Sequence, residues 1–99
     1  MSENLIFLPK AREDISEAYS WYEEQSLGLG MDFLRCLEIA TCTIARTPLM
    51  FPPVYKDYRR VLVRRFPYAV FYEILDEKIM VYSVFHCSRN PKKWRDRLP

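Results

Sequence analysis

The stretch that decides the fold is residues 59–86, which read RRVLVRRFPYAVFYEILDEKIMVYSVFH. Its apolar positions are rich in Val, Ile, Phe and Tyr, the residue types that strands favour. Pro67 and the charged run Asp76-Glu77-Lys78 interrupt it, so we predict three strands, at residues 59–66, 69–75 and 79–86. Because such short connections join neighbouring strands, the three should pair antiparallel.

Two amphipathic helices are predicted ahead of these strands. Apolar residues recur at helical spacing between residues 11 and 22 and again between 31 and 46, as they do when each helix buries one face. Gly28 and Gly30, the two glycines of the chain, lie between these segments and are expected to form the turn of an αα-hairpin. The solvent side of the first helix is expected to carry Glu13, Ser16, Glu17, Glu23 and Glu24.

The remaining segments complete the order of elements. The apolar run at residues 5–8 predicts a strand that ends at Pro9, and the segment with Pro48, Pro52 and Pro53 predicts an extended loop. The sequence therefore predicts an α+β fold of order β-α-α-β-β-β, in which an αα-hairpin packs on one antiparallel sheet and a short basic C-terminal tail follows. Residues 1–99 are expected to form a single domain, because a chain of this length encloses one modest core.

The composition is that of a globular protein, with 49% hydrophobic and 28% charged residues. No apolar run approaches the roughly 20 residues of a membrane span, and the N-terminus lacks the pattern of a signal peptide, so we expect a cytoplasmic protein. Cys36, Cys42 and Cys87 are odd in number and widely spaced, which argues against a disulfide framework and a zinc site. With no Gly-rich phosphate loop or catalytic triad spacing either, we expect no metal and no cofactor.

Charge is distributed unevenly along the chain. Residues 1–50 hold four Lys and Arg against eight Asp and Glu, and residues 51–99 hold eleven against five. This asymmetry hints at an anionic partner for the second half, although segregation by chance is an alternative. Strand alternation predicts Arg59 and Arg65 on one face of their strand and Arg60 and Arg64 on the other. A second basic cluster comprises Arg89, Lys92, Lys93, Arg95 and Arg97 around Trp94.

These clusters suit recognition of phosphates or acidic peptides, because guanidinium groups offer paired donors and aromatic rings offer a stacking surface. The competing interpretation is a solvated strand edge and tail whose cations discourage aggregation. Composition alone does not separate the two.

Several motifs, in order, resemble the RelE/ParE superfamily of bacterial toxins and its ParE side in particular. They are AREDI at residues 11–15, WYEEQ at 21–25, GLG at 28–30, RRVLVRRFPYAVFY at 59–72 and VFHCSRNP at 84–91, followed by Trp94. The resemblance spans nearly the whole chain and implies the helical hairpin on an antiparallel sheet predicted above. It also implies the toxin of a type II toxin–antitoxin system, of the kind often described as plasmid stabilization proteins.

The resemblance further implies partners. The toxin would form a hetero-oligomer with a cognate antitoxin, and its target would be DNA gyrase if it acts as ParE-type members do. RelE-type members instead cleave mRNA at the ribosome, and a degenerate toxin that only binds antitoxin is a third alternative.

One position favours the ParE side. RelE-type nucleases carry a catalytic arginine where this chain has Ala69, and the tyrosine they carry near the end has no clear counterpart, because Trp94 and Arg95 stand there. Arg89 does match a second nuclease arginine. We therefore lean toward a toxin that is not an enzyme. If it were a nuclease, the expected catalytic residues would be His86, Arg89, Arg60, Arg64 and Arg65.

Two binding surfaces are predicted. Residues 86–97 are expected to engage the target while contributing little to the fold, with Arg89, Lys92, Lys93, Trp94 and Arg95 as the contacts. Ile39 and Cys42 lie off the core stripe of the second helix, which leaves apolar surface for a wrapping chain. The residues expected to bind antitoxin are Ile39, Cys42, Arg59 and Arg65.

Overall fold

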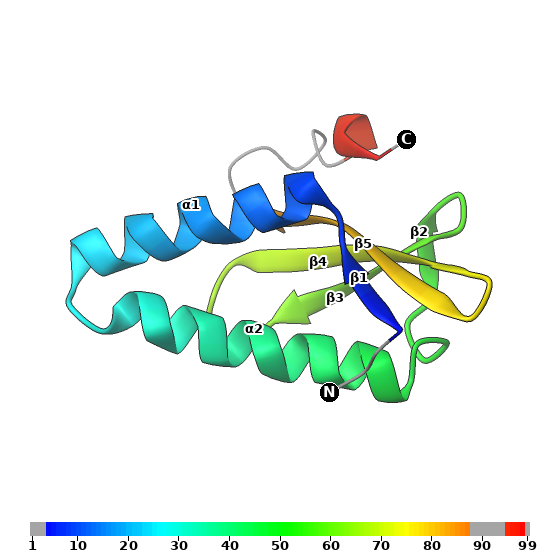
Figure 1. Ribbon diagram of the computed structural model, residues 1–99, viewed down its shortest axis with the longest axis horizontal. Helices are drawn as coiled ribbons and strands as arrows, with labels where there is room; N and C mark the ends of the chain where they lie inside the picture. The colour runs from blue at the N-terminus through cyan, green and yellow to red at the C-terminus, as the bar shows by residue number, and fades with distance from the viewer. Residues whose placement is uncertain (1–3, 88–94, 99) are drawn as a thin grey trace.

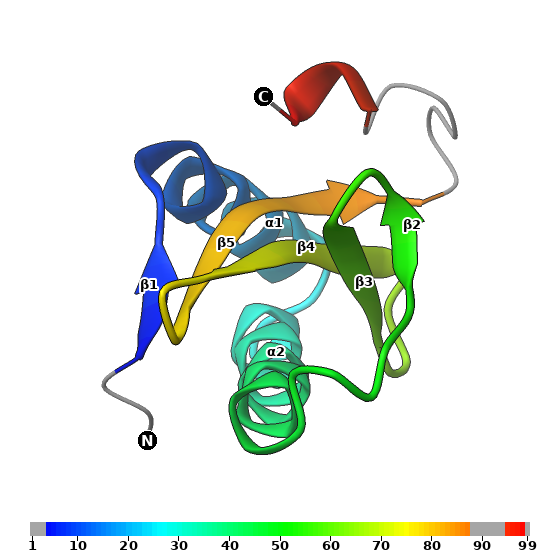
Figure 2. The ribbon, with the colours of Figure 1, turned by 90° about the vertical axis from the view of Figure 1, so that its right-hand side faces the viewer.

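The computed structural model describes residues 4–87 and 95–98. Along the chain the elements are β1 (Leu5–Phe7), α1 (Pro9–Gln25), α2 (Leu29–Arg46), β2 (Pro53–Tyr55), β3 (Tyr58–Val63), β4 (Tyr68–Leu75), β5 (Lys78–His86) and the 3-10 turn η1 (Arg95–Arg97). The helical hairpin lies on the sheet, with α1 along β5 and α2 along β3 (Figure 1). Figure 2 shows η1 on the opposite side of the sheet from α2. The α+β prediction is thus confirmed.

The sheet is mixed rather than wholly antiparallel. Its strand order is β1-β5-β4-β3-β2, and the pairs formed among β2 to β5 are antiparallel as predicted. β1 instead runs parallel to β5, with Leu5 opposite Ile79. The argument from short connections did not apply to this pair, because both helices and three strands separate the two partners in sequence. β2 is a further difference, since it forms within the segment predicted to be a loop.

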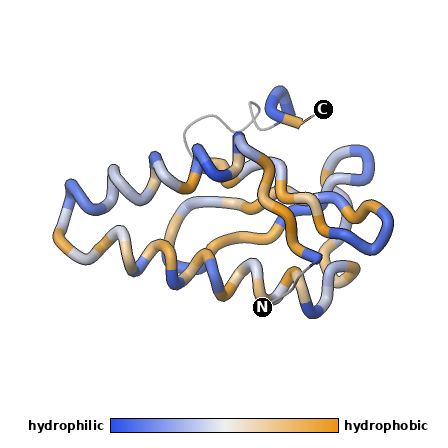
Figure 3. The backbone as a smooth tube through the Cα atoms, in the orientation of Figure 1, coloured by the Kyte–Doolittle hydropathy of each residue, from blue (hydrophilic) through white to orange (hydrophobic). Residues whose placement is uncertain are grey.

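Most of the core lies between the hairpin and the sheet. Four aromatic side chains fill the end nearest the helix–helix turn: Tyr22 from α1, Phe33 from α2, and Phe66 and Tyr68 from the segment leading into β4. Phe33 is fully buried, and its ring centroid lies 5.4 Å from that of Phe66 and 5.1 Å from that of Tyr68. Edge-to-face contacts of this kind add to the stabilisation from burial. Figure 3 shows hydrophobic residues recurring along α2 and concentrated in β1. Among the described residues, no helix is both long and apolar enough to cross a bilayer.

The turn between the helices depends on Glu23, which was predicted to face solvent and instead caps α2. Its carboxylate accepts hydrogen bonds from the backbone N–H groups of Gly28 and Gly30, both at 2.9 Å. Gly28 has a φ of 91°, a conformation that favours glycine. A Cβ atom on Gly30 would lie 2.8 Å from the Tyr19 ring, so the helices can approach closely only with glycine there. A negative charge at the start of α2 also interacts favourably with the helix dipole.

We expect Glu23→Ala to lower the free energy of unfolding by about 1 kcal/mol, the usual cost of losing an N-terminal helix cap. In a domain of this size that corresponds to a fall in Tm of about 4–8 °C. Thermal unfolding followed by circular dichroism would measure it. Glu24→Ala is the matched control, because Glu24 is exposed at the next position of α1. Equal Tm values for the two variants would contradict the capping role.

The outer face of the sheet, on the side away from the helices, carries a second apolar cluster that the C-terminal residues complete. Leu98 is 7% exposed and packs with Tyr58, Ala69 and Phe71. The adjacent Arg97 forms an ion pair with Asp14 of α1. The prediction that residues 86–97 contribute little to the fold is therefore wrong. The helices bury one face of the sheet only, so the other face still needed a cover.

Candidate functional site

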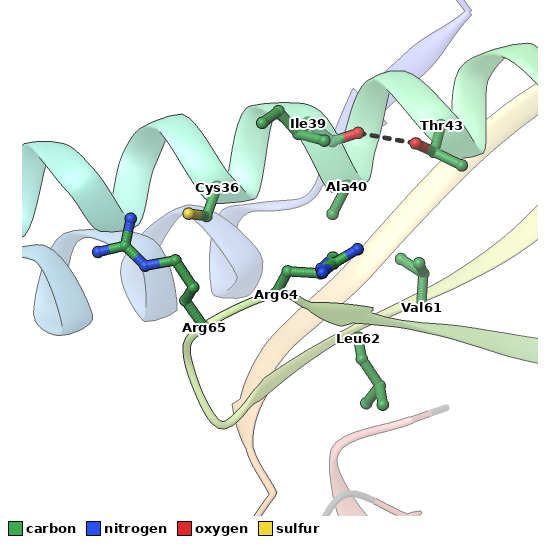
Figure 4. A pocket seen from close by; sticks show the side chains of 8 residues that line it. All are labelled: Cys36, Ile39, Ala40, Thr43, Val61, Leu62, Arg64 and Arg65. Carbon is green, nitrogen blue, oxygen red and sulfur yellow. Dashed lines mark hydrogen bonds between the residues drawn. The ribbon is translucent and has the colours of Figure 1, made fainter.

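A groove of about 560 Å³ opens between α2 and β3 (Figure 4). It is lined from the helix by Cys36, Ile39, Ala40 and Thr43, and from the strand and the turn after it by Val61, Leu62, Arg64 and Arg65. The helix side carries small side chains, which keep α2 from filling the space against the strand. The side chains lining it are mostly apolar, with cations at one end.

The groove is open because the sheet is short at this edge. β2 pairs with β3 only at Tyr58 and Arg59, so the edge of β3 that faces away from β4 has no described partner strand from Val61 to Val63. The hydroxyl of Thr43 is already used, since it donates to the carbonyl oxygen of Ile39 at 3.0 Å (Figure 4). The helix side of the groove therefore offers a partner apolar contact rather than free hydrogen-bonding groups.

One exposed apolar side chain, that of Ile39, borders the groove from α2 and is 65% exposed. The Leu62 side chain is 60% exposed but points away from α2 (Figure 4), because Leu62 lies opposite Ala69 of the outer-face cluster. Single exposed apolar residues are ordinary on protein surfaces, but Ile39 lies beside a concave, mostly apolar surface, as interaction sites do. This arrangement is suited to binding an apolar segment of another chain.

Arg64 and Arg65 do not alternate between faces as predicted. β3 ends at Val63, and Arg65 has a φ of 75° within the following turn, so strand alternation stops before both arginines. As a result both side chains line the same groove (Figure 4). The Arg65 guanidinium carbon lies 5.7 Å from the centroid of the Phe66 ring. The two arginines place positive charge at one end of an apolar surface.

The four residues predicted to bind antitoxin are placed differently from one another. Ile39 and Arg65 line the groove. Cys42 is exposed on α2 but is not among the lining residues. Arg59 is half-buried and donates a hydrogen bond to the carbonyl oxygen of Phe51, which ties the preceding loop to β3. Sequence reasoning missed the rest of the lining, because it depends on where β2 stops pairing.

The residues considered for catalysis are not brought together. His86 lies opposite Tyr68 in the sheet, with ring centroids 5.0 Å apart, on the face that packs against the helices. Arg60 lies opposite Phe71, on the outer face, because paired residues of adjacent strands share a face. Arg64 and Arg65 lie in the groove, and Arg89 falls outside the described residues. Within residues 4–87 and 95–98, no three His, Cys, Asp or Glu side chains gather as a metal site would need.

Of the residues predicted to contact the target, Arg89, Lys92, Lys93 and Trp94 also lie outside the described residues. Arg95 is exposed in η1, where its guanidinium carbon is 5.1 Å from the centroid of the Tyr55 ring. It therefore lies on the outer face of the sheet, which the groove does not share.

Comparisons with known proteins agree with this fold and place it among toxins. A family described as "ParE toxin of type II toxin-antitoxin system, parDE" matches residues 5–91. Toxin ParE2 of two Mycobacterium tuberculosis strains is 31% identical over 80 residues, which cover 80% of this chain and 76% of the relative. A solved structure titled "Chromosomal ParDE TA system from P. aeruginosa" superposes with a TM-score of 0.63 at 15% identity, covering 84% of this chain and 94% of that one. At that identity the structural match supports the fold alone.

Proposed function

The chain belongs to the ParE toxin family of type II toxin–antitoxin systems, and on that basis we propose that it arrests growth in the cytoplasm by inhibiting DNA gyrase. A cognate antitoxin is its partner, and we place the antitoxin in the groove between α2 and β3. The observation that carries this placement is the mostly apolar groove beside exposed Ile39, with Arg64 and Arg65 at one end.

The groove specifies the chemistry of the antitoxin segment. Aliphatic side chains would fill the space against Ala40 and Val61 and cover Ile39, as an amphipathic segment does when it lies in a groove. Carboxylates beside them would meet Arg64 and Arg65, which steers association and fixes the register. Of the residues expected from the sequence, Ile39 and Arg65 would make direct contact, Cys42 would lie beside the groove on α2, and Arg59 would act through the loop it holds.

The positions of the candidate catalytic side chains on the sheet support inhibition by binding rather than RNA cleavage. Metal-independent cleavage of RNA needs a base, an acid and cations around one phosphate. His86 and Arg60 lie on opposite faces, and Ala69 is fully buried within the outer-face cluster. Among the described residues, no arrangement of those groups surrounds a common point.

The test pairs a supercoiling assay with toeprinting on translating ribosomes. We expect the purified toxin to inhibit gyrase supercoiling and the antitoxin to relieve that inhibition, while toeprints show no new cuts. Codon-specific cuts that disappear in Arg89→Ala would contradict the proposal and establish the mRNA endonuclease alternative. Binding to antitoxin without any growth arrest would identify a degenerate toxin.

A further inference from the structure

A row of three tyrosines on the outer face of the sheet lies away from the antitoxin groove. Tyr55 and Tyr58 face each other across the tight turn between β2 and β3, with their rings stacked at 6.4 Å. Tyr58 makes an edge-on contact with Tyr82 of β5 at 5.2 Å. Burial and the hydrogen bond to Glu73 raise the pKa of Tyr82 to about 12. Tyr58 is 6% exposed and is held between the rings of Tyr55 and Tyr82. The half-buried Tyr55 ring therefore packs on a side chain that has little freedom to move.

Two exposed cations that are distant from each other in sequence lie near the Tyr55 ring. The Nζ atom of Lys56 lies 5.3 Å from its centroid and the guanidinium carbon of Arg95 lies 5.1 Å away. These separations are within the range of cation–π attraction. A tyrosine flanked by cations on a rigid turn offers apolar area, hydrogen-bond donors and charge in one small surface.

Arg95 is held in this position by the residues that follow it. The Nη2 atom of Arg97 donates to both carboxylate oxygens of Asp14, at 2.6 and 2.8 Å. Asp14 is fixed in turn, because it accepts a hydrogen bond from the backbone N–H of Val84 at 3.0 Å. Burial raises the pKa of the Asp14 carboxyl, and the hydrogen bonds from Val84 and Arg97 oppose that rise. Leu98, inserted in the outer cluster, provides a second anchor.

The backbone of Lys56 is fixed by the tight turn between β2 and β3. Its φ is 52°, in the left-handed region that two-residue hairpin loops use and where glycine or asparagine is favoured. Three other non-glycine residues among those described also have a positive φ, namely Arg65, Asp76 and Glu77. The turn therefore holds the backbone of one of the two cations beside Tyr55 in a defined position.

The surrounding charges indicate the class of partner. Lys56 and Arg95 lie over the Tyr55 ring, and exposed Asp57 and Asp96 follow them in sequence, so the cations are few and are interspersed with carboxylates along the chain. A nucleic-acid site depends instead on a net positive surface that displaces counterions from phosphates. Tyrosine and arginine with mixed charge at the rim are the composition of hot spots in protein–protein interfaces.

We propose that Tyr55, Lys56 and Arg95 form a docking surface for a carboxylate-bearing protein surface on the toxin's target, with Asp14 and Arg97 as positioning residues. This inference rests on the proposed function, because it names the surface by which the toxin engages that target. It is separate from the antitoxin groove, which α2 and β3 form, because η1, which carries Arg95, lies on the opposite side of the sheet from α2 (Figure 2).

The sharpest variant is Lys56→Gly. Glycine relieves the left-handed backbone while removing the cation, so this variant should be at least as stable as the wild type and still be impaired. Combined with Arg95→Gln, we expect target inhibition and growth arrest to weaken about tenfold or more, as loss of hot-spot side chains does. Antitoxin affinity should stay unchanged. Lys78→Gln, at the exposed lysine that begins β5, is the matched control and should act as the wild type does.

The positioning role is tested with Asp14→Asn. The amide oxygen can still accept from Val84, but the charge that holds Arg97 is lost. We expect weaker target inhibition together with unchanged antitoxin affinity, a split that general destabilisation would not produce. Arg97→Lys, which keeps the positive charge opposite Asp14, should retain more activity than Arg97→Gln.

Growth arrest by the Lys56→Gly, Arg95→Gln double variant at wild-type potency would overturn the docking surface, whatever the target is. Failure of the gyrase assignment looks different. In that case the wild type would arrest growth without inhibiting supercoiling, and the double variant would still lose the arrest.

Discussion

Ending the chain after Cys87 is expected to cost the protein much of its stability. The truncation removes Leu98, and full burial of one leucine contributes about 1.5–3 kcal/mol. It also removes Arg97, leaving the Asp14 carboxylate, whose side chain is 11% exposed, without its counterion. Loss of hydrogen bonds between charged groups costs roughly 1.5–3 kcal/mol more. Small domains have only about 5–15 kcal/mol of net stability, so we expect Tm to fall by at least about 10 °C.

Thermal and urea unfolding of the free toxin, separated from its antitoxin, would measure this loss. Leu98→Ala should reproduce a large part of it. Leu62→Ala removes the same atoms from a side chain that is 60% exposed, so it should change Tm little and serves as the control. If the truncated protein unfolds cooperatively with a Tm within a few degrees of that of the full chain, the C-terminal contacts do not stabilise the fold.

Placing a charge at Ile39 should have the largest effect on antitoxin binding. Ile39 is 65% exposed in the free toxin, so Ile39→Asp leaves the core intact. In the complex the carboxylate would be buried against apolar side chains, at a cost well above the loss of the isoleucine itself. Because truncation of a hot-spot residue alone costs at least about 2 kcal/mol, we expect the Kd for antitoxin to rise about 30-fold or more.

Isothermal titration with the purified antitoxin would give the Kd, and growth assays would show whether the variant escapes neutralisation. Leu27→Asp is the control, because Leu27 is 93% exposed in the turn between the helices and is not among the groove residues. If Ile39→Asp binds antitoxin as tightly as Leu27→Asp does, the groove is not the antitoxin site.

Local patterns were sufficient to predict the helical hairpin and the three long strands. Helical spacing of apolar residues and runs of β-branched and aromatic residues are determined by neighbours in sequence, which is why these elements lie within a few residues of where they were expected. The resemblance to ParE toxins came from motifs within the same elements, and the family comparison confirms it.

The misses all depend on contacts between distant residues. No local pattern marks Asp14 as the partner of Arg97, 83 residues later. The sequence alone therefore did not indicate that the C-terminal residues stabilise the fold. The face predicted for Arg64 was wrong because the strand ends at Val63, so Arg64 lines the same groove as Arg65 and Val61. The groove itself could not be predicted, since it exists where β2 stops pairing with β3. Glu23 carried a usable signal, a carboxylate shortly before the glycine turn, which was assigned to the solvent face instead.

The parallel pairing of β1 with β5 has a consequence for the timing of synthesis. β1 precedes both helices in sequence, yet its hydrogen-bonding partner, β5, is the last of the described strands. The ion-pair partner of Asp14, Arg97, follows later still. The nascent chain can form its helical hairpin early, but β1 gains its partner only after β5 has left the ribosome. Contacts so distant in sequence form late and slowly. The sheet is therefore incomplete while the hairpin is already made, and an antitoxin present in the cell has time to meet the toxin as it folds.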